Sequence, residues 1–167
     1  METPDPAPAP RPEGSVGFLL VQLGFHLAGR YGERLAPLGL EQRQAGMLVR
    51  LAGNDGKSQQ AIAELLGVNA TRMVFLTDEL EQLGLVERRR NPADRRSHAL
   101  HLTDAGKAML ARIMQVTAAH EADVTTALDD SEREELTALL RRIADAQGLA
   151  AGSLPGPPPR HTSPPAG

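Results

Sequence analysis

Residues 59–110 read QQAIAELLGVNATRMVFLTDELEQLGLVERRRNPADRRSHALHLTDAGKAML, and this stretch decides the fold. A short helix is predicted to begin after Ser58, whose side chain can cap it, and to end at Gly67. A second helix is predicted between a cap at Asn69 and a stop at Gly84. The tight turn between them makes the pair a helix-turn-helix. The inward side chains of the first helix are Ile62, Leu65 and Leu66.

The second of these helices has two contrasting faces. Apolar residues at helical spacing form its predicted core face: Met73, Leu76, Leu80 and Leu83. The opposite face carries Thr71, Val74, Phe75, Asp78 and Gln82. In a helix-turn-helix the second helix can lie in the major groove of DNA, so this mixed polar and apolar face is the predicted recognition surface.

Two short runs with a different period follow this helix. LVERRR at 85–90 and SHALHL at 97–102 flank the turn-forming NPADRR, and Leu100 and Leu102 share one face, as in a half-buried strand. We therefore predict a two-stranded hairpin. Residues 87–97 hold five arginines against two acidic residues, a net charge of +3 in a chain whose overall net charge is -3. This local charge indicates phosphate contact, while the alternative is a solvated charged hairpin.

Further helices are predicted on both sides of this core. Apolar residues at helical spacing mark one long helix over 16–36 and a second helix that carries Leu40, Met47, Leu48 and Leu51. After the hairpin, Thr103 caps a helix that runs to about residue 128, and a capping-box pattern at Ser131 and Glu134 opens a last one. The fold class is mainly α with a small β-hairpin. The terminal helices carry more apolar surface than a small winged helix can cover, which indicates an interface.

Length and composition limit the classes of function. The 167 residues suit one domain, placed at 15–148 between proline-rich tails at 1–14 and 149–167 that are predicted to be disordered. The DNA-binding core is expected at about 40–105, and dimerisation helices at 16–36 and 104–147. The chain has no cysteine, which excludes disulfides, cysteine-bound metals and thiol chemistry. It shows neither a secretory signal nor an apolar run of membrane-spanning length, so we expect a cytoplasmic protein with no membrane partner.

Four segments resemble the MarR family of bacterial transcriptional regulators: AIAELLG, LEQLGLVERR, DRR and LTDAG. The resemblance implies a winged helix-turn-helix regulator that binds a pseudo-palindromic operator in double-stranded DNA. We expect it to act as a repressor. It also implies a homodimer whose terminal helices interleave. By the family's motif Asp94 and Arg96 match the wing pair, in which the arginine enters the minor groove and the aspartate orients it, and Arg95 then contacts phosphate. No cofactor is expected.

The recognition helix departs from the family's pattern. Val74 and Phe75 stand where the family often has a polar residue followed by arginine, and the basic residue is Arg72, nearer the helix start. We expect groove contacts from Thr71 and Arg72. The residues assigned to the DNA backbone are Gln59, Gln60, Arg88 and Arg90. Two interpretations of Phe75 stay open: packing on thymine methyl groups, which predicts an A·T-rich half-site, or packing in a gap beside the wing.

Many members of the family release DNA when a small aromatic or anionic effector binds between the dimer helices and the winged helix. His26, Arg30 and Tyr31 lie on the first helix where such a site would be lined, and a purely structural role is the alternative for each. No metal is expected. His98 and His101 point to opposite faces of a strand, and a pair formed by His26 and His120 across the helical layer would lack a carboxylate.

Two other classes of function are an enzyme and a protein-binding dimer. The sequence contains no P-loop, GxGxxG, GxSxG or HExxH motif, so no enzymatic activity is predicted. The remaining alternative is a winged-helix dimer that acts through protein–protein contacts without sequence-specific DNA binding. The exposed positions of Val74 and Phe75 keep that alternative open.

Overall fold

The computed structural model describes residues 14–90 and 98–149. The two predicted tails, apart from Gly14 and Leu149, and the wing tip with Asp94, Arg95 and Arg96 lie outside the described residues. The helices are α1 (Val16–Leu35), the 3-10 turn η2 (Ala36–Leu38), α2 (Gln42–Ala52), α3 (Gln59–Leu66), α4 (Ala70–Gln82), α5 (Asp104–Val124) and α6 (Asp130–Ala146). The strands β1 (Val86–Arg90) and β2 (His98–Leu102) pair antiparallel between α4 and α5. The predicted order of elements is confirmed.

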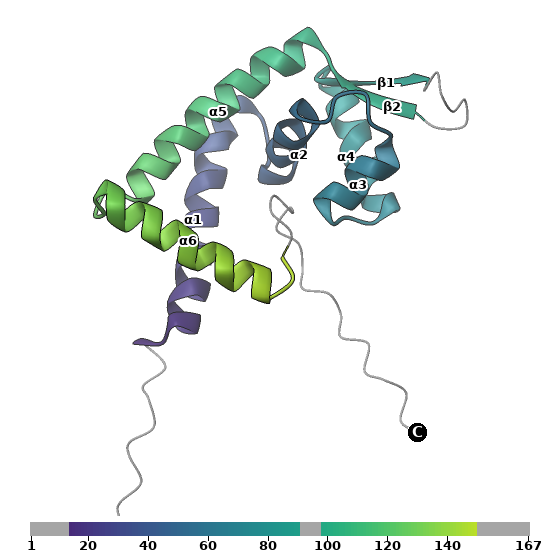
Figure 1. Cartoon of the computed structure of the whole chain (residues 1–167). Helices are drawn as coiled ribbons and strands as arrows, with labels where there is room; N and C mark the ends of the chain where they lie inside the picture. Colours follow the sequence, from purple (N-terminus) through teal and green to yellow (C-terminus); the bar gives the residue numbers. More distant parts are fainter. Residues whose placement is uncertain (1–13, 91–97, 150–167) are drawn as a thin grey trace, which may run out of the picture.

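The core lies at the end of the molecule where α2, α3, α4 and the hairpin meet (Figure 1). Its largest fully buried apolar side chains come from six elements: Leu35, Met47, Leu48, Leu51, Ile62, Leu66, Met73, Leu80, Leu100 and Ile113. Val86 of a seventh element, β1, is almost as deeply buried. Helix α1 packs along α5. Helix α6 turns back from the far end of α5, and none of its residues is buried.

The caps predicted from the sequence hold the helices of the core. The side chain of Ser58 accepts the N–H of Ala61, and that of Asn69 accepts the N–H of Arg72. Gly67 and Gly84 have positive φ angles of 66° and 69°, a conformation that a side chain would disfavour. The turn between α3 and α4 and the turn between α4 and β1 are therefore both set by local sequence.

Several details differ from the sequence-based expectations. Leu40, one of the residues that mark the predicted second helix, lies two residues before α2, which begins at Gln42. Leu83 is 49% exposed because it is the C-cap of α4, where the chain already turns away, and the fully buried fourth residue of that face is Thr77. The hydroxyl of Thr77 donates to the carbonyl of Met73 at 2.8 Å, which satisfies the polar group inside the core. Helix α5 ends at Val124, four residues earlier than predicted.

The predicted start of the last helix is wrong by two residues. The capping box consists of Asp129 and Glu132, each accepting the other's backbone N–H at 2.9 Å. Ser131 lies inside the first turn of α6. Asp129 takes the cap because its carboxylate both accepts the N–H and carries the negative charge that a helix N-terminus favours. Among the described residues, no helix is long and apolar enough to cross a membrane.

Candidate nucleic-acid interface

Helix α4 presents the predicted recognition surface to solvent. Thr71 and Arg72 are exposed in its first turn, and Val74 and Phe75 follow with 42% and 63% of their surface exposed. Among the described residues, no element covers Phe75. The other interpretation, packing in a gap beside the wing, concerns a wing tip that lies outside the described residues. The remaining apolar face of the helix is in the core.

The hairpin divides its arginines between two faces. Val86 pairs with Leu102, Arg88 with Leu100 and Arg90 with His98, so Arg88 and Arg90 share the face of the buried Val86. Glu87 and Arg89 lie on the other face, where they form an ion pair with each other. The side chains of a strand alternate, and a row of three consecutive arginines therefore cannot act as one surface.

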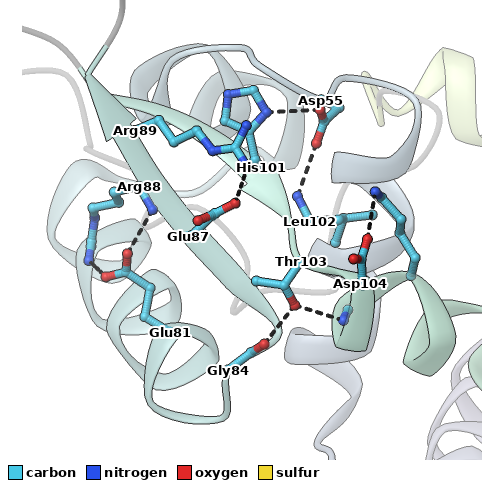
Figure 2. Close-up of polar contacts among 12 residues, drawn as sticks. Asp55, Glu81, Gly84, Glu87, Arg88, Arg89, His101, Leu102, Thr103 and Asp104 are labelled. Carbon is cyan, nitrogen blue, oxygen red and sulfur yellow. Dashed lines mark hydrogen bonds and ion pairs between the residues drawn. The ribbon is translucent and has the colours of Figure 1, made fainter.

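Arg88 is the arginine that the fold encloses. Its side chain is only 20% exposed, and its Nε donates to Gln59 Oε1 at 3.0 Å. One Nη atom lies 2.7 Å from Asp78 Oδ1, and the other contacts Glu81. The second oxygen of Glu81 accepts the backbone N–H of Arg88 at 2.8 Å, so both carboxylate oxygens are engaged (Figure 2). The structure thus brings together Gln59 and Arg88, both assigned to DNA from sequence, with two acidic residues. Asp78 was placed on the recognition face without a role, and Glu81 was not singled out from the sequence.

A signal for this arrangement was present in the sequence. Val86 and Arg88 are two residues apart in a strand, so a buried Val86 implies that Arg88 points toward the same helices.

Of the other assigned residues, Gln60 is exposed and donates to Glu64 at 3.2 Å. Arg90 is exposed and pairs with none of the described side chains. Fewer arginines of the described hairpin are therefore free to contact phosphate than its sequence suggests.

The opposite side of the hairpin is anchored to the loop between α2 and α3. The N–H of Gly56 donates to the carbonyl of Leu100 at 2.8 Å, and the N–H of Leu100 donates to the carbonyl of Lys57 at 3.0 Å, next to an isolated antiparallel bridge between Ser58 and Ala99 of β2. Asp55 accepts the N–H of Leu102 at 3.0 Å and contacts Nδ1 of His101 at 2.9 Å (Figure 2). Partial burial raises the pKa of Asp55, but these two partners together lower it by more, and the net pKa lies below its ordinary value.

The LTDAG segment joins the hairpin to α5. The hydroxyl of Thr103 accepts the N–H of Gly106 at 2.9 Å and donates to the carbonyl of Gly84 at 2.6 Å (Figure 2). The N–H of Thr103 donates to the carbonyl of Leu85 at 3.1 Å. A Cβ atom on Gly106 would lie 2.0 Å from that carbonyl oxygen, so only glycine fits there. The segment therefore has a structural role: it joins the hairpin to α5.

The predicted effector residues lie along α1, and two of them face α5. Arg30 and Arg34 both contact Asp123, at 2.5 and 2.7 Å. The Tyr31 hydroxyl is 2.9 Å from the hydroxyl of Thr117, and its ring centroid is 5.2 Å from that of His120. His26 is exposed. Within the described residues, no group of three or more His, Asp or Glu side chains is arranged to hold a metal.

Comparison with known proteins gives a consistent result. The MarR family model matches residues 38–97. A putative transcriptional regulatory protein for the hcr operon of Thauera aromatica is 36% identical over 137 residues, covering 76% of this chain and 81% of that protein. A solved transcriptional repressor, CouR, bound to a 23-mer DNA duplex, is 37% identical with a TM-score of 0.73 over 78% of this chain and 92% of that one. CouR from Rhodococcus jostii RHA1 bound to p-coumaroyl-CoA is 28% identical with a TM-score of 0.71, covering 81% and 96%.

Proposed function

The chain belongs to the MarR family of transcriptional regulators, and we propose that it binds a pseudo-palindromic operator as a homodimer in the cytoplasm and represses transcription. The observation that carries the proposal is the open face of α4, which holds Arg72 and Phe75 beside the hairpin and is covered by no other described element. A second helix of a helix-turn-helix that is open in this way fits the major groove. The 37% identity with a repressor bound to a DNA duplex supports the same reading.

The homodimer is supported by the apolar surface of the terminal helices. Leu136, Leu139, Leu140 and Ile143 follow helical spacing along α6 and are 39–45% exposed. At the start of α1, Phe18, Leu19, Leu20 and Leu23 are 37–50% exposed. Stripes of this length are uncommon on monomeric surfaces, and covering each such side chain contributes about 1 to 2 kcal/mol. A second copy that packs its α1 and α6 against these stripes would bury both.

The contacts with DNA follow from the exposed residues. In this proposal Arg72 and Thr71 reach base edges from the first turn of α4, and Val74 and Phe75 pack on thymine methyl groups. Gln60 and Arg90 contact phosphates from the start of α3 and from the hairpin. Asp94, Arg95 and Arg96 retain the wing roles that the family resemblance implies.

An anionic effector is proposed to act at the contact between α1 and α5. Two guanidinium groups, those of Arg30 and Arg34, share the single carboxylate of Asp123, so the cluster carries a net positive charge. A carboxylate or phosphate group would compete with Asp123 for these arginines, and an aromatic group would lie beside Tyr31 and His120. The neighbour that is bound to p-coumaroyl-CoA supports an effector of this chemical kind.

Fluorescence anisotropy with duplexes from the promoter region of its own gene tests the proposal. Binding should be sequence-specific, and the plot of log affinity against log salt should have a slope of about -5 to -9 if about 6 to 10 phosphates are neutralised. Arg72→Ala should weaken specific binding, while Arg142→Ala on the distant α6 is the matched control. A folded dimer that binds every duplex equally would instead favour the protein–protein alternative, for which the exposed Phe75 is the specific observation.

A further inference from the structure

We infer that Arg88 is a positioning residue that fixes the hairpin against α3 and α4, and that it does not contact DNA phosphate itself. The inference rests on the proposed DNA-binding function, which it deepens. It also replaces the role given to Arg88 by counting the charges of the hairpin.

The first argument is the geometry of the guanidinium group. Its three nitrogen atoms reach three different side chains, Gln59 on α3 and both Asp78 and Glu81 on α4. The planar fork of an arginine suits such a multiple contact, and a lysine ammonium does not reproduce it. Arg88 is therefore a cross-link between one strand and both helices of the helix-turn-helix.

The second argument is electrostatic. One positive charge lies between two carboxylates, those of Asp78 and Glu81, so the cluster has a net charge of about -1. A phosphate that approached Arg88 would meet this excess negative charge at short range, where repulsion is strong. Arg90 on the same face of β1 has no acidic partner among the described residues, which makes it the better phosphate contact of the two.

The third argument is where the hairpin is otherwise attached. Strand β2 is held by Asp55 and by the backbone bonds of Gly56 and Lys57. Strand β1 follows α4 after a short turn at Gly84, and beyond the buried Val86 its links to the helices run through Arg88. Loss of Arg88 would leave β2 anchored and free β1 beyond Val86, so the hairpin would change its angle without unfolding.

This angle affects sequence-specific binding more than general binding. On an operator, α4 must lie in the major groove while the hairpin reaches the adjacent backbone, and both must fit at once. On nonspecific DNA the phosphates can be contacted in many registers, and a fixed angle is not required. A looser hairpin therefore lowers the affinity for the operator and leaves the nonspecific affinity nearly unchanged.

The test uses the full-length protein, a duplex selected by it from random sequences, and a scrambled duplex of the same composition. Affinities for both are measured across a range of salt concentrations for the parent, Arg88→Ala, Arg88→Lys, Glu81→Gln and the control Arg90→Ala. We expect Arg88→Ala, Arg88→Lys and Glu81→Gln to lose about tenfold in operator affinity with the salt slope unchanged. Arg90→Ala should reduce the slope by about 2, since the dimer would lose two phosphate contacts.

The outcomes separate the alternatives. A slope reduced by about 2 in Arg88→Ala, or near-parental operator affinity in Arg88→Lys, would identify Arg88 as a phosphate contact and overturn the inference. Tighter operator binding by Glu81→Gln would do the same, because that change frees Arg88 and removes a negative charge. If the parent itself does not distinguish the two duplexes, the proposed function is overturned and the inference falls with it. Arg88→Lys and Glu81→Gln keep the test decisive if Arg88→Ala does not fold.

Discussion

Replacement of Gly106 by alanine should destabilise this protein, although the same change stabilises most helices. Gly106 occupies the third position of α5, and its backbone passes so close to the end of the preceding turn that an added Cβ would lie 2.0 Å from the Leu85 carbonyl oxygen. Side chains in folded proteins do not approach backbone atoms to less than 3.0 Å, so the two segments would have to separate by roughly 1 Å.

The magnitude follows from three contributions. Overpacking of this kind costs about 1 to 3 kcal/mol. Separation of the segments also lengthens the bond from the Thr103 N–H to the same Leu85 oxygen, now 3.1 Å, which costs about 1 kcal/mol. The helix propensity of alanine returns at most about 1 kcal/mol. The net loss is about 1 to 3 kcal/mol, or a fall in Tm of about 3 to 10 °C for a domain of this size.

Thermal and urea unfolding at a fixed protomer concentration measure this effect. Gly29→Ala on α1 is the matched control, because a Cβ there would meet nothing within 4 Å in the protomer. We expect that variant to gain up to about 1 kcal/mol from helix propensity alone. If Gly106→Ala is as stable as the parent, the close approach of α5 to Leu85 is not a feature of the folded protein.

Three further predictions concern the loop anchor, the dimer and the operator. Because the folded-state pKa of Asp55 lies below its ordinary value of 3.8, its ionised form stabilises the fold above about pH 4, and this stability is lost as the pH falls through the folded-state pKa. Asp55→Asn should therefore lower Tm at neutral pH and make Tm depend less on pH below about 5. If Tm of the variant falls at acid pH as steeply as that of the parent, Asp55 does not stabilise the fold in this way. Leu139→Glu should abolish the dimer in sedimentation at micromolar concentration, since a charge would be buried at the interface, and a stable dimer of that variant would refute the proposed contact. Changing Val74 to Thr and Phe75 to Arg should move selected duplexes toward G·C at one or two positions per half-site. Unchanged selected sequences would show that these side chains do not read thymine.

Sequence alone determined the elements whose causes are local. The caps at Ser58, Asn69 and Thr103 each bond to an N–H three residues away, and the stops at Gly67 and Gly84 depend on one residue's φ angle. Signals of this range can be found in a single sequence, and so can the period of two in β2. Where two local signals compete, as for the two capping boxes before α6, the choice between them was wrong by two residues.

Only the tertiary structure decided which of the polar side chains are free to contact DNA. A charge count treats Arg88 and Arg90 alike, but Arg88 meets Gln59 from 29 positions away and Asp78 and Glu81 on α4, while Arg90 lies beyond them. The place of Gly106 against Leu85, and of Asp55 against β2, likewise depends on elements packing together. Ion pairs and close approaches between distant segments leave no periodic trace in the sequence, because each needs a single partner and not a repeated pattern. The fold class therefore followed from local periodicity. Which arginines of the hairpin are exposed depended on contacts that form only when the elements pack together.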